Sequence, residues 1–347
     1  MKWFLHDLLL ALGLLALPVA VTAGGRQPII DMHLHAVSPA INGGIPPHGT
    51  CMPLASMPRR DAAEAYDAVF SAAMANHDCK DPLPTPATDD EMRVQTLAML
   101  EKHNVIGVHS AHSDAYDKAW RKAAPERLIP AGPVFLDPLK IDAGVVARVK
   151  AMKASGDLAV LGEIGPQYSG ILPDDPRLAP FWTMAEDLDL PVGIHIGTGP
   201  PGAPYAFGGA FKGYRARLHS PLTIEEVLIR HPKLRVYLMH AGYPMLDDLL
   251  ATLYAHPQLY VDIGVIGYTQ PRPAFYRFLQ GIVEAGFADR VMFGSDNMNW
   301  PGAIERTIQV VEEAPFLSQR QKRDILYNNA ARFLRLDGAT IRRHHAM

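Results

Sequence analysis

The sequence predicts an α/β protein, a (β/α)8 TIM barrel with a long insertion after its first strand. Eight short apolar runs alternate with helix-like segments over about 300 residues, which is typical of βα units. The runs are apolar at successive positions, as in strands that a parallel sheet buries on both faces. The alternative is an open doubly wound sheet, but its glycine-rich dinucleotide fingerprint does not follow the first run.

The first 23 residues predict a signal peptide. Lys2 precedes an apolar run, Leu8 to Val21, and small residues surround a cut after Ala23. A membrane anchor is the alternative, but about fourteen apolar residues fall short of the roughly twenty that span a bilayer. We therefore expect a periplasmic or secreted protein with no stable membrane association after cleavage.

The first strand, Ile29 to His35, carries three polar side chains at alternating positions. With a two-residue period, Asp31, His33 and His35 leave one face of the strand. Two imidazoles on a rigid strand can bind one metal ion, with Asp31 supporting them from behind. Chance placement is the alternative in a chain with 15 histidines.

Residues 38–88 form the insertion, which is rich in Pro and Gly and has one expected helix, 61–75. A loop this long in a compact domain is usually functional, often as a lid. In an exported chain, Cys51 and Cys79 are expected to form a disulfide. The alternative is a small zinc site made with His48 and His77.

The remaining units follow in order. Helix 89–103 opens on three carboxylates, which suit the positive end of a helix dipole. After it, apolar runs alternate with segments of helical periodicity. Expected strands are 105–109, 128–135, 159–164, 191–196, 234–240, 259–263 and 290–295; expected helices are 116–124, 143–154, 178–188, 221–230, 245–255, 273–285, 304–313, 318–327 and 329–334.

Composition fits one large barrel domain, residues 24–337, followed by a tail, 338–347, whose basic end we expect to be frayed. The chain is 48% hydrophobic and 20% charged, which is enough for a sizeable core. A net charge of −3 and the lack of a basic stripe argue against a nucleic-acid partner.

Polar residues end several of the apolar strands, where a barrel places its functional groups. A charged or imidazole side chain there is costly unless it has a partner. A metal ion is the simplest partner that they can share. The residues are His33, His35, Glu163, His195, His240 and Asp296.

With these motifs the chain resembles the amidohydrolase superfamily, in the amidohydrolase-related branch of aminocarboxymuconate-semialdehyde decarboxylase-like proteins. The resemblance spans almost the whole mature chain in the expected order. It is carried by Asp31-x-His33-x-His35, Gly193-Ile194-His195, Leu238-Met239-His240-Ala241-Gly242, Phe293-Gly294-Ser295-Asp296 and the closing stretch Asn328 to Leu334.

The resemblance implies one divalent metal ion, zinc above all, bound by His33, His35, His195 and Asp296. In one-metal relatives the residue matching His240 binds or orients water; in two-metal relatives it binds the second ion. No lysine is available at the end of strand four for the carbamate bridge of many two-metal relatives. Glu163 stands there, in Gly-Glu-Ile-Gly, and either bridges two ions or supports one site.

A divalent ion lowers the pKa of bound water toward about 7 and polarises a carbonyl. We expect Asp296 to be both ligand and general base, and His240 to stabilise the oxyanion or orient the water. A helix cap is the alternative role for Asp296.

Substrate-binding residues are less well marked. Arg215 and Arg217 can bind a carboxylate, and Trp300, with other loop aromatics, can form a wall. His109 closes the second strand near the expected mouth. For each residue, packing or solvent exposure is the alternative.

The sequence thus predicts an exported, zinc-dependent hydrolase of an amide, ester or lactone bond in a small molecule. A metal-dependent, non-oxidative decarboxylase on the same scaffold is the first alternative. A binding protein without turnover is the second. Self-association as a homodimer is an expectation without an identified interface.

Overall fold

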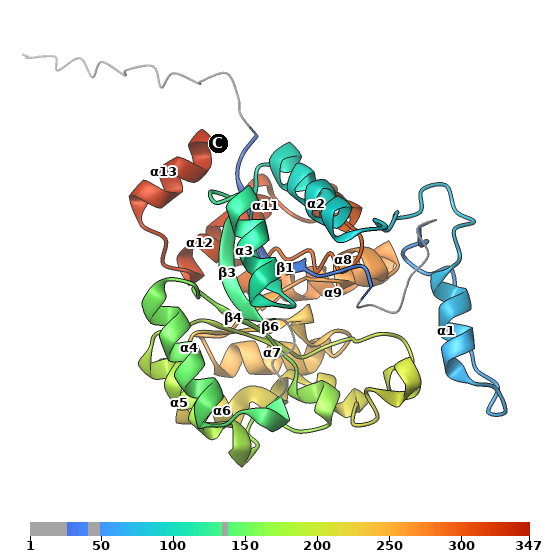
Figure 1. The fold of residues 1–347 in the computed structure, drawn as a ribbon, viewed down its shortest axis with the longest axis horizontal. Helices are drawn as coiled ribbons and strands as arrows, with labels where there is room; N and C mark the ends of the chain where they lie inside the picture. Colours follow the sequence, from blue (N-terminus) through green and yellow to red (C-terminus); the bar gives the residue numbers. More distant parts are fainter. Residues whose placement is uncertain (1–25, 41–48, 134–137) are drawn as a thin grey trace, which may run out of the picture.

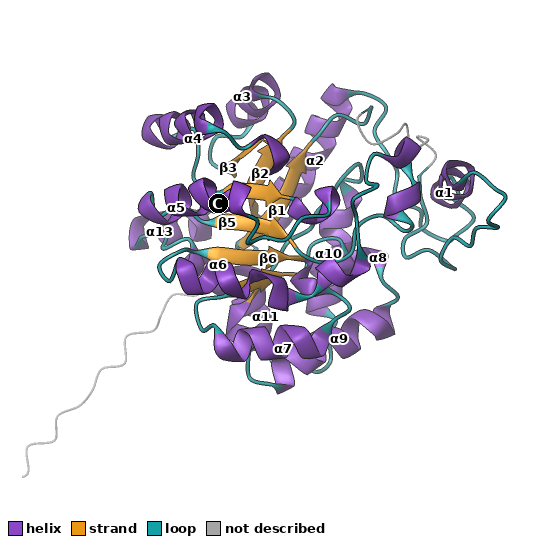
Figure 2. Cartoon of the chain, turned by 90° about the horizontal axis from the view of Figure 1, so that it is seen from below, coloured by secondary structure: helices purple, strands orange, loops and turns teal. Residues whose placement is uncertain are grey.

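The computed structural model describes residues 26–40, 49–133 and 138–347. Eight parallel strands lie at the centre of the molecule, with helices around them (Figures 1 and 2). They are β1 (Ile29–Ala36), β2 (Val105–Ala111), β3 (Leu128–Pro133), β4 (Leu161–Ile164), β5 (Val192–His195), β6 (Val236–Met239), β7 (Tyr260–Asp262) and β8 (Val291–Met292). The predicted signal peptide, residues 1–23, lies outside the described residues.

Most helices lie within a few residues of the predicted ranges, but α8 was not predicted, and the helix expected at 318–327 continues as a π-helical turn at 324–328. In the described part of the chain, no helix is both long and apolar enough to cross a membrane. The helices are α1 (Tyr66–Met74), α2 (Asp89–His103), α3 (Asp114–Ala123), α4 (Ala143–Ser155), α5 (Ala179–Asp187), α6 (Glu225–Arg230), α7 (Leu246–Ala255), α8 (Ile266–Thr269), α9 (Arg272–Glu284), α10 (Gly302–Glu312), α11 (Gln319–Arg323), α12 (Asn329–Phe333) and α13 (Gly338–Ala346).

The strands follow one another around the barrel in sequence order, as two ladders, β1-β2-β3 and β4-β5-β6-β7-β8. A few backbone hydrogen bonds cross the two seams between the ladders. Met32 N donates to Phe293 O at 2.9 Å, and Ala159 N donates to Pro130 O at 2.8 Å. The predicted (β/α)8 fold is confirmed, although its ladder is not continuous.

Apolar side chains fill both faces of the strands, which explains the unbroken apolar runs in the sequence. The larger cluster packs the strands against the surrounding helices. A smaller cluster lies on the other strand face and includes residues of α12 and the turn before it. Its buried members are Ile30, Met32, Val108, Ala131, Val160, Tyr237, Met239, Met292, Tyr327, Ala330, Ala331 and Phe333.

The insertion connects two sides of the barrel mouth. On one side, the Tyr66 hydroxyl donates to Pro201 O at 2.8 Å; on the other, Arg306 donates to Met52 O at 2.8 Å. Its helix α1 lies at the edge of the molecule in both views (Figures 1 and 2). It begins at Tyr66 and not at Asp61, because Asp61 accepts the backbone N–H groups of Ala63 and Glu64 in a turn.

Cys51 and Cys79 form a disulfide, as expected. Because both sulfurs are used in this bond, the alternative zinc site with His77 is wrong. Its other expected ligand, His48, lies outside the described residues.

The C-terminal segment is an ordered helix, so the expectation of a frayed tail is wrong. Asp337 accepts the backbone N–H of Thr340 at 2.7 Å and caps α13. His344 is buried, its ring meets the Tyr327 hydroxyl at 3.1 Å, and its carbonyl accepts from Asn104. The packing of His344 could not be predicted from this short basic sequence, because a single buried histidine produces no apolar stripe.

Candidate metal centre

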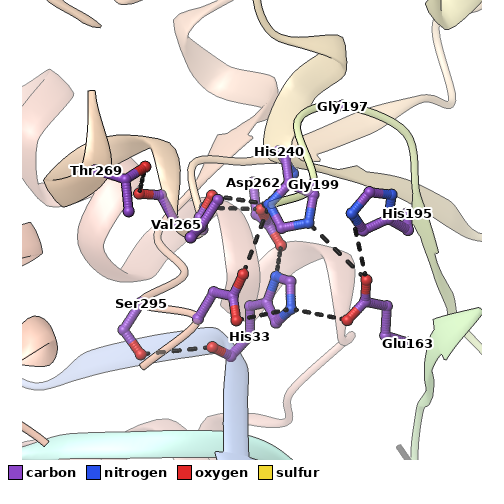
Figure 3. Close-up of polar contacts among 12 residues, drawn as sticks. His33, Glu163, His195, Gly197, Gly199, His240, Asp262, Val265, Thr269 and Ser295 are labelled. Carbon is purple, nitrogen blue, oxygen red and sulfur yellow. Dashed lines mark hydrogen bonds and ion pairs between the residues drawn. The ribbon is translucent and has the colours of Figure 1, made fainter. Parts of the chain in front are cut away.

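The structure brings the six residues at the predicted strand ends together in one buried cluster. Figure 3 labels four of them, His33, Glu163, His195 and His240. None of the six is more than 5% exposed. We call this set the metal cluster: His33, His35, Glu163, His195, His240 and Asp296.

Glu163, at the end of β4, lies between two pairs of imidazoles. Its Oε2 is 3.6 Å from His33 Nε2 and 3.5 Å from His35 Nε2. Its Oε1 is 3.8 Å from His195 Nε2 and 3.9 Å from His240 Nε2. The two oxygens of one carboxylate therefore face different histidine pairs. Figure 3 shows His33 on one side of Glu163, and His195 and His240 on the other.

Asp296 approaches the cluster from the loop after β8. Its Oδ1 is 3.1 Å from His35 Nε2 and 3.8 Å from His33 Nε2, and its Oδ2 is 3.8 Å from His240 Nδ1. Its backbone has a φ of 48°, a region that aspartate tolerates better than most residues. The next helix, α10, has Pro301 at its N-cap, so the Asp296 carboxylate is not the helix cap considered from sequence.

Asp262, at the end of β7, is a candidate functional residue that was not predicted from the sequence. Its Oδ2 accepts from His33 Nδ1 at 3.1 Å, and its Oδ1 accepts the backbone N–H groups of His240 and Gly264. It is completely buried. The only signal in the sequence is a single acid within an apolar strand.

These contacts fix which imidazole nitrogen faces the metal cluster. His33 directs Nδ1 to Asp262, and His240 directs Nδ1 to the Gly264 carbonyl at 2.9 Å. In both rings Nε2 is left facing Glu163, as in histidines that bind metal through Nε2. Asp31 supports the site differently from the prediction: it accepts the backbone N–H groups of His33 and Ser295.

His195 is held by two residues of the turn after β4. Its Nδ1 is 2.9 Å from Gln167 Oε1, and its Nε2 is 2.9 Å from the Tyr168 hydroxyl. Neither Gln167 nor Tyr168 was predicted, since both lie in an irregular loop without a recognisable pattern.

The ionisable side chains of the metal cluster differ in how far their pKa values are shifted, and in which direction. Burial alone would raise the pKa of Glu163, but His240, His33 and His35 hold that pKa well below its usual range. Burial opposes ionisation of Asp296 too, yet His33 and His35 lower its pKa to about 2. Burial, with His240 nearby, lowers the pKa of His195 to about 3. The same carboxylates raise the pKa of His33, His35 and His240 against the effect of burial, and a metal ion would take the place of protons between these imidazoles and the carboxylates.

The residues fit a divalent metal ion. Nitrogen and oxygen ligands lie within 4.8 Å of one another in three overlapping groups, two of which contain Glu163. His33 Nε2 is buried and makes no hydrogen bond among the described residues, only longer contacts of 3.6 Å to Glu163 and 3.8 Å to Asp296. Imidazole and carboxylate ligands suit zinc and similar ions.

The structure does not bring the expected substrate-binding residues to the cluster. Arg215 and Arg217 are exposed, and Arg215 donates to carbonyls of its own loop. His109 points away from it, with Nε2 2.8 Å from Asp117 of α3. Trp300 is buried under the insertion, in a cluster with Met52, Leu54, Met74, Leu83, Tyr268 and Ala303.

The family model described as Amidohydrolase matches residues 30–336. No curated protein matches the chain significantly.

Among solved structures, a TIM-barrel protein from Bordetella bronchiseptica is 20% identical, with a TM-score of 0.57, over 90% of this chain and 99% of that one. A 5-carboxyvanillate decarboxylase from Sphingomonas paucimobilis is 15% identical, with a TM-score of 0.54, over 90% and 100%. A 4-oxalomesaconate hydratase from Rhodopseudomonas palustris is 16% identical, with a TM-score of 0.53, over 90% and 97%. At these identities the similarity shows the fold alone.

Proposed function

The chain belongs to the amidohydrolase family of metal-dependent enzymes, and from this premise we propose that it hydrolyses an amide, ester or lactone bond of a small molecule. The metal cluster is the proposed active site. In a one-ion site His33, His35, His195 and Asp296 are the proposed ligands; in the two-ion site that we favour, His195 joins His240 and Glu163 as a ligand of the second ion. Zinc is the proposed metal.

The position of Glu163 carries the proposal. One of its oxygens faces His33 and His35, and the other faces His195 and His240, each at 3.5–3.9 Å. Glu163 therefore belongs to two groups of potential ligands, one with His33 and His35 and one with His195 and His240, which favours two ions. Sites with two ions favour hydrolysis, because they can activate water and stabilise the leaving oxygen together.

When bound, a divalent ion in such a site lowers the pKa of water and polarises a carbonyl group. Asp296 is ionised and lies against His35 and His33, so its carboxylate can accept the proton of an attacking water and return it to the leaving group. His240 donates from Nδ1 to Gly264. Its Nε2 is therefore an acceptor or a ligand, and it donates to a substrate oxygen only after protonation.

Non-oxidative decarboxylation is the alternative reaction, and it needs no attacking water. The fold is compatible with it, since the 5-carboxyvanillate decarboxylase has a similar barrel. Because the two chains are only 15% identical, the similarity does not show that they share a substrate. The two reactions differ in whether an oxygen atom of water enters the product.

Two measurements test the proposal. Elemental analysis of protein purified without a histidine tag should find about two zinc ions per chain, and Glu163→Gln should lower that content. A matched control is Glu305→Gln, which removes an exposed ion pair with Lys102. For a substrate found by screening esters, lactones and amides, turnover in heavy-oxygen water should label the product. Release of carbon dioxide without labelling would reject hydrolysis.

We also propose that the protein is exported to the periplasm or secreted. Support comes from the signal-like residues 1–23 and from the disulfide between Cys51 and Cys79, a bond that persists in oxidising compartments. A fusion of residues 1–23 to a reporter that is active only outside the cytoplasm tests this. We further propose that the substrate is a small molecule. We also propose that the protein forms a homodimer, which light scattering tests.

A further inference from the structure

Tyr168 lies where a substrate would meet the metal cluster. It belongs to the 3-10 turn Pro166–Ser169, which follows β4 and its terminal Glu163. Its ring packs against His195, with centroids 4.4 Å apart, and against Phe211 at 4.7 Å. Its hydroxyl is 2.9 Å from His195 Nε2, the nitrogen that faces Glu163.

Two glycines leave the space that this ring occupies. A Cβ at Gly165 would come within 2.8 Å of Tyr168 Cδ2. A Cβ at Gly199 would lie 3.2 Å from Tyr168 Cε1 and 3.3 Å from its hydroxyl. Real Cβ atoms essentially never approach as closely as the first distance, so the phenol occupies a fitted position between the two loops.

The direction of the hydrogen bond can be derived from Gln167. Its Nε2 donates to Gly197 O at 2.8 Å, so its Oε1 is the atom that faces His195 Nδ1. Nδ1 must then carry the proton of the neutral ring, and Nε2 is an acceptor. Tyr168 is therefore the donor in its bond with His195.

This bond and a metal ion need the same lone pair. His195 Nε2 has one lone pair, and the proposed function uses it to bind the metal. The Tyr168 O–H then needs a new acceptor next to the ion, where a substrate oxygen would bind. A neutral donor fixed at that point stabilises an oxygen on which negative charge develops.

We propose that Tyr168 is a substrate-contacting catalytic residue, whose phenol donates a hydrogen bond to the substrate oxygen that becomes negatively charged. The inference rests on the proposed function, because it needs a metal-loaded site. No proton is transferred from the phenol in this role; it remains a donor throughout.

Tyr168→Phe tests the proposal, with Tyr214→Phe as the matched control. Tyr214 is also a buried tyrosine beside this loop, but its hydroxyl bonds to Gly197, Gly199 and His219, away from the cluster. The probe is acetohydroxamic acid, which places oxygen atoms on a metal ion. Its affinity for the zinc-loaded protein is measured by calorimetry, and bound zinc by elemental analysis.

We expect Tyr168→Phe to keep the wild-type zinc content and to bind the probe about tenfold or more weakly, as for loss of a hydrogen bond to a charged group. Tyr214→Phe should stay within about twofold. With an identified substrate, kcat should fall by roughly 10²-fold or more while KM changes little.

Unchanged probe affinity in Tyr168→Phe, with zinc bound, would overturn the role of Tyr168 and leave the proposed function intact. Loss of zinc in Tyr168→Phe would also overturn it, because the phenol would then only position His195. A wild-type protein that binds no divalent ion would instead reject the proposed function itself.

Gly165→Ala is a second variant, in case Tyr168→Phe does not fold, because the atoms nearest to a Cβ there all belong to Tyr168. It retains the phenol but crowds it, and its backbone is not in the left-handed region. We expect weaker probe binding at normal zinc content, and full wild-type affinity would count against the proposal.

Discussion

Asp262 and His33 are joined by a hydrogen bond of 3.1 Å between side chains that are 229 residues apart in the sequence. The carboxylate comes from β7 and the imidazole from β1, so the pair joins the two strand ladders of the barrel. The same carboxylate also accepts the backbone N–H of His240 at 3.0 Å. One buried acid therefore orients a proposed ligand on either side of Glu163.

Asp262→Asn should weaken metal binding. The amide can still accept the backbone N–H groups through its oxygen, but it then presents an N–H to His33 Nδ1. The ring proton moves to Nε2, where it blocks the ligand position. We expect a loss of about 10–100-fold in zinc affinity, the range for outer partners of metal-binding histidines, measured by competition with a chromophoric chelator.

Asp117→Asn is the matched control for this variant. Asp117 also lies close to a buried histidine, with 2.8 Å between its Oδ1 and His109 Nε2, but the pair lies outside the metal cluster. Its zinc affinity should equal that of the wild type. If both variants lost zinc affinity to the same extent, the loss would reflect lower stability of the fold. The contact between Asp262 and His33 would then have no specific role in metal binding.

Asp296→Asn should abolish turnover while the barrel still folds. Asparagine tolerates the positive φ of this position as well as aspartate does, and it keeps the side-chain size. It cannot accept a proton, so kcat should fall by about 10²–10⁴-fold. Thermal unfolding should show a cooperative transition, and wild-type kcat would rule out Asp296 as the general base.

The double variant Cys51→Ser, Cys79→Ser should destabilise the insertion. The disulfide closes a segment of 28 residues, and on the chain-entropy model its loss costs roughly 3 kcal/mol. Denaturant unfolding measures the loss, and limited proteolysis should show faster cleavage between residues 49 and 83. Adding reductant to the double variant should change nothing, whereas it should reproduce the loss in the wild type.

The proposed ligands could be predicted because each ends an apolar strand, and a barrel brings all its strand ends to one mouth. His33 and Glu163 lie within their strands, whereas Asp296 lies four residues beyond the short strand β8 and was predicted because the apolar run was expected to extend to Ser295. Asp262 was missed although it follows the same rule, because it was counted as part of its strand. Tyr168 and Gln167 could not be predicted, since the path of an irregular turn depends on tertiary packing, here on the space beside Gly165 and Gly199.

Loop packing likewise decides the positions of Trp300 and Arg215. Trp300 has a large apolar side chain, which is buried against Met52 and Leu83 of the insertion. Arg215 finds acceptors in its own loop. The sequence names both residues as candidates but has no periodicity that would orient them.

His219 should make stability depend on pH. It is buried, and its Nε2 meets the Tyr214 hydroxyl at 2.5 Å. Burial lowers the pKa of His219 to about 4 in the folded protein, below its ordinary value of 6.5. The unfolded chain therefore binds a proton first as the pH falls, and stability drops between about pH 6.5 and pH 4. Between pH 7 and pH 5 this group alone should cost about 2 kcal/mol.

The test compares the wild type with His219→Gln in denaturant unfolding at pH 7 and pH 5. The variant loses stability at pH 7 through its altered contact with Tyr214, but its further loss on acidification should be smaller by about 2 kcal/mol. His77→Gln, at an exposed position, is the control and should keep the wild-type slope. Equal slopes in the wild type and His219→Gln would mean that His219 takes up its proton in the folded protein as readily as in the unfolded chain.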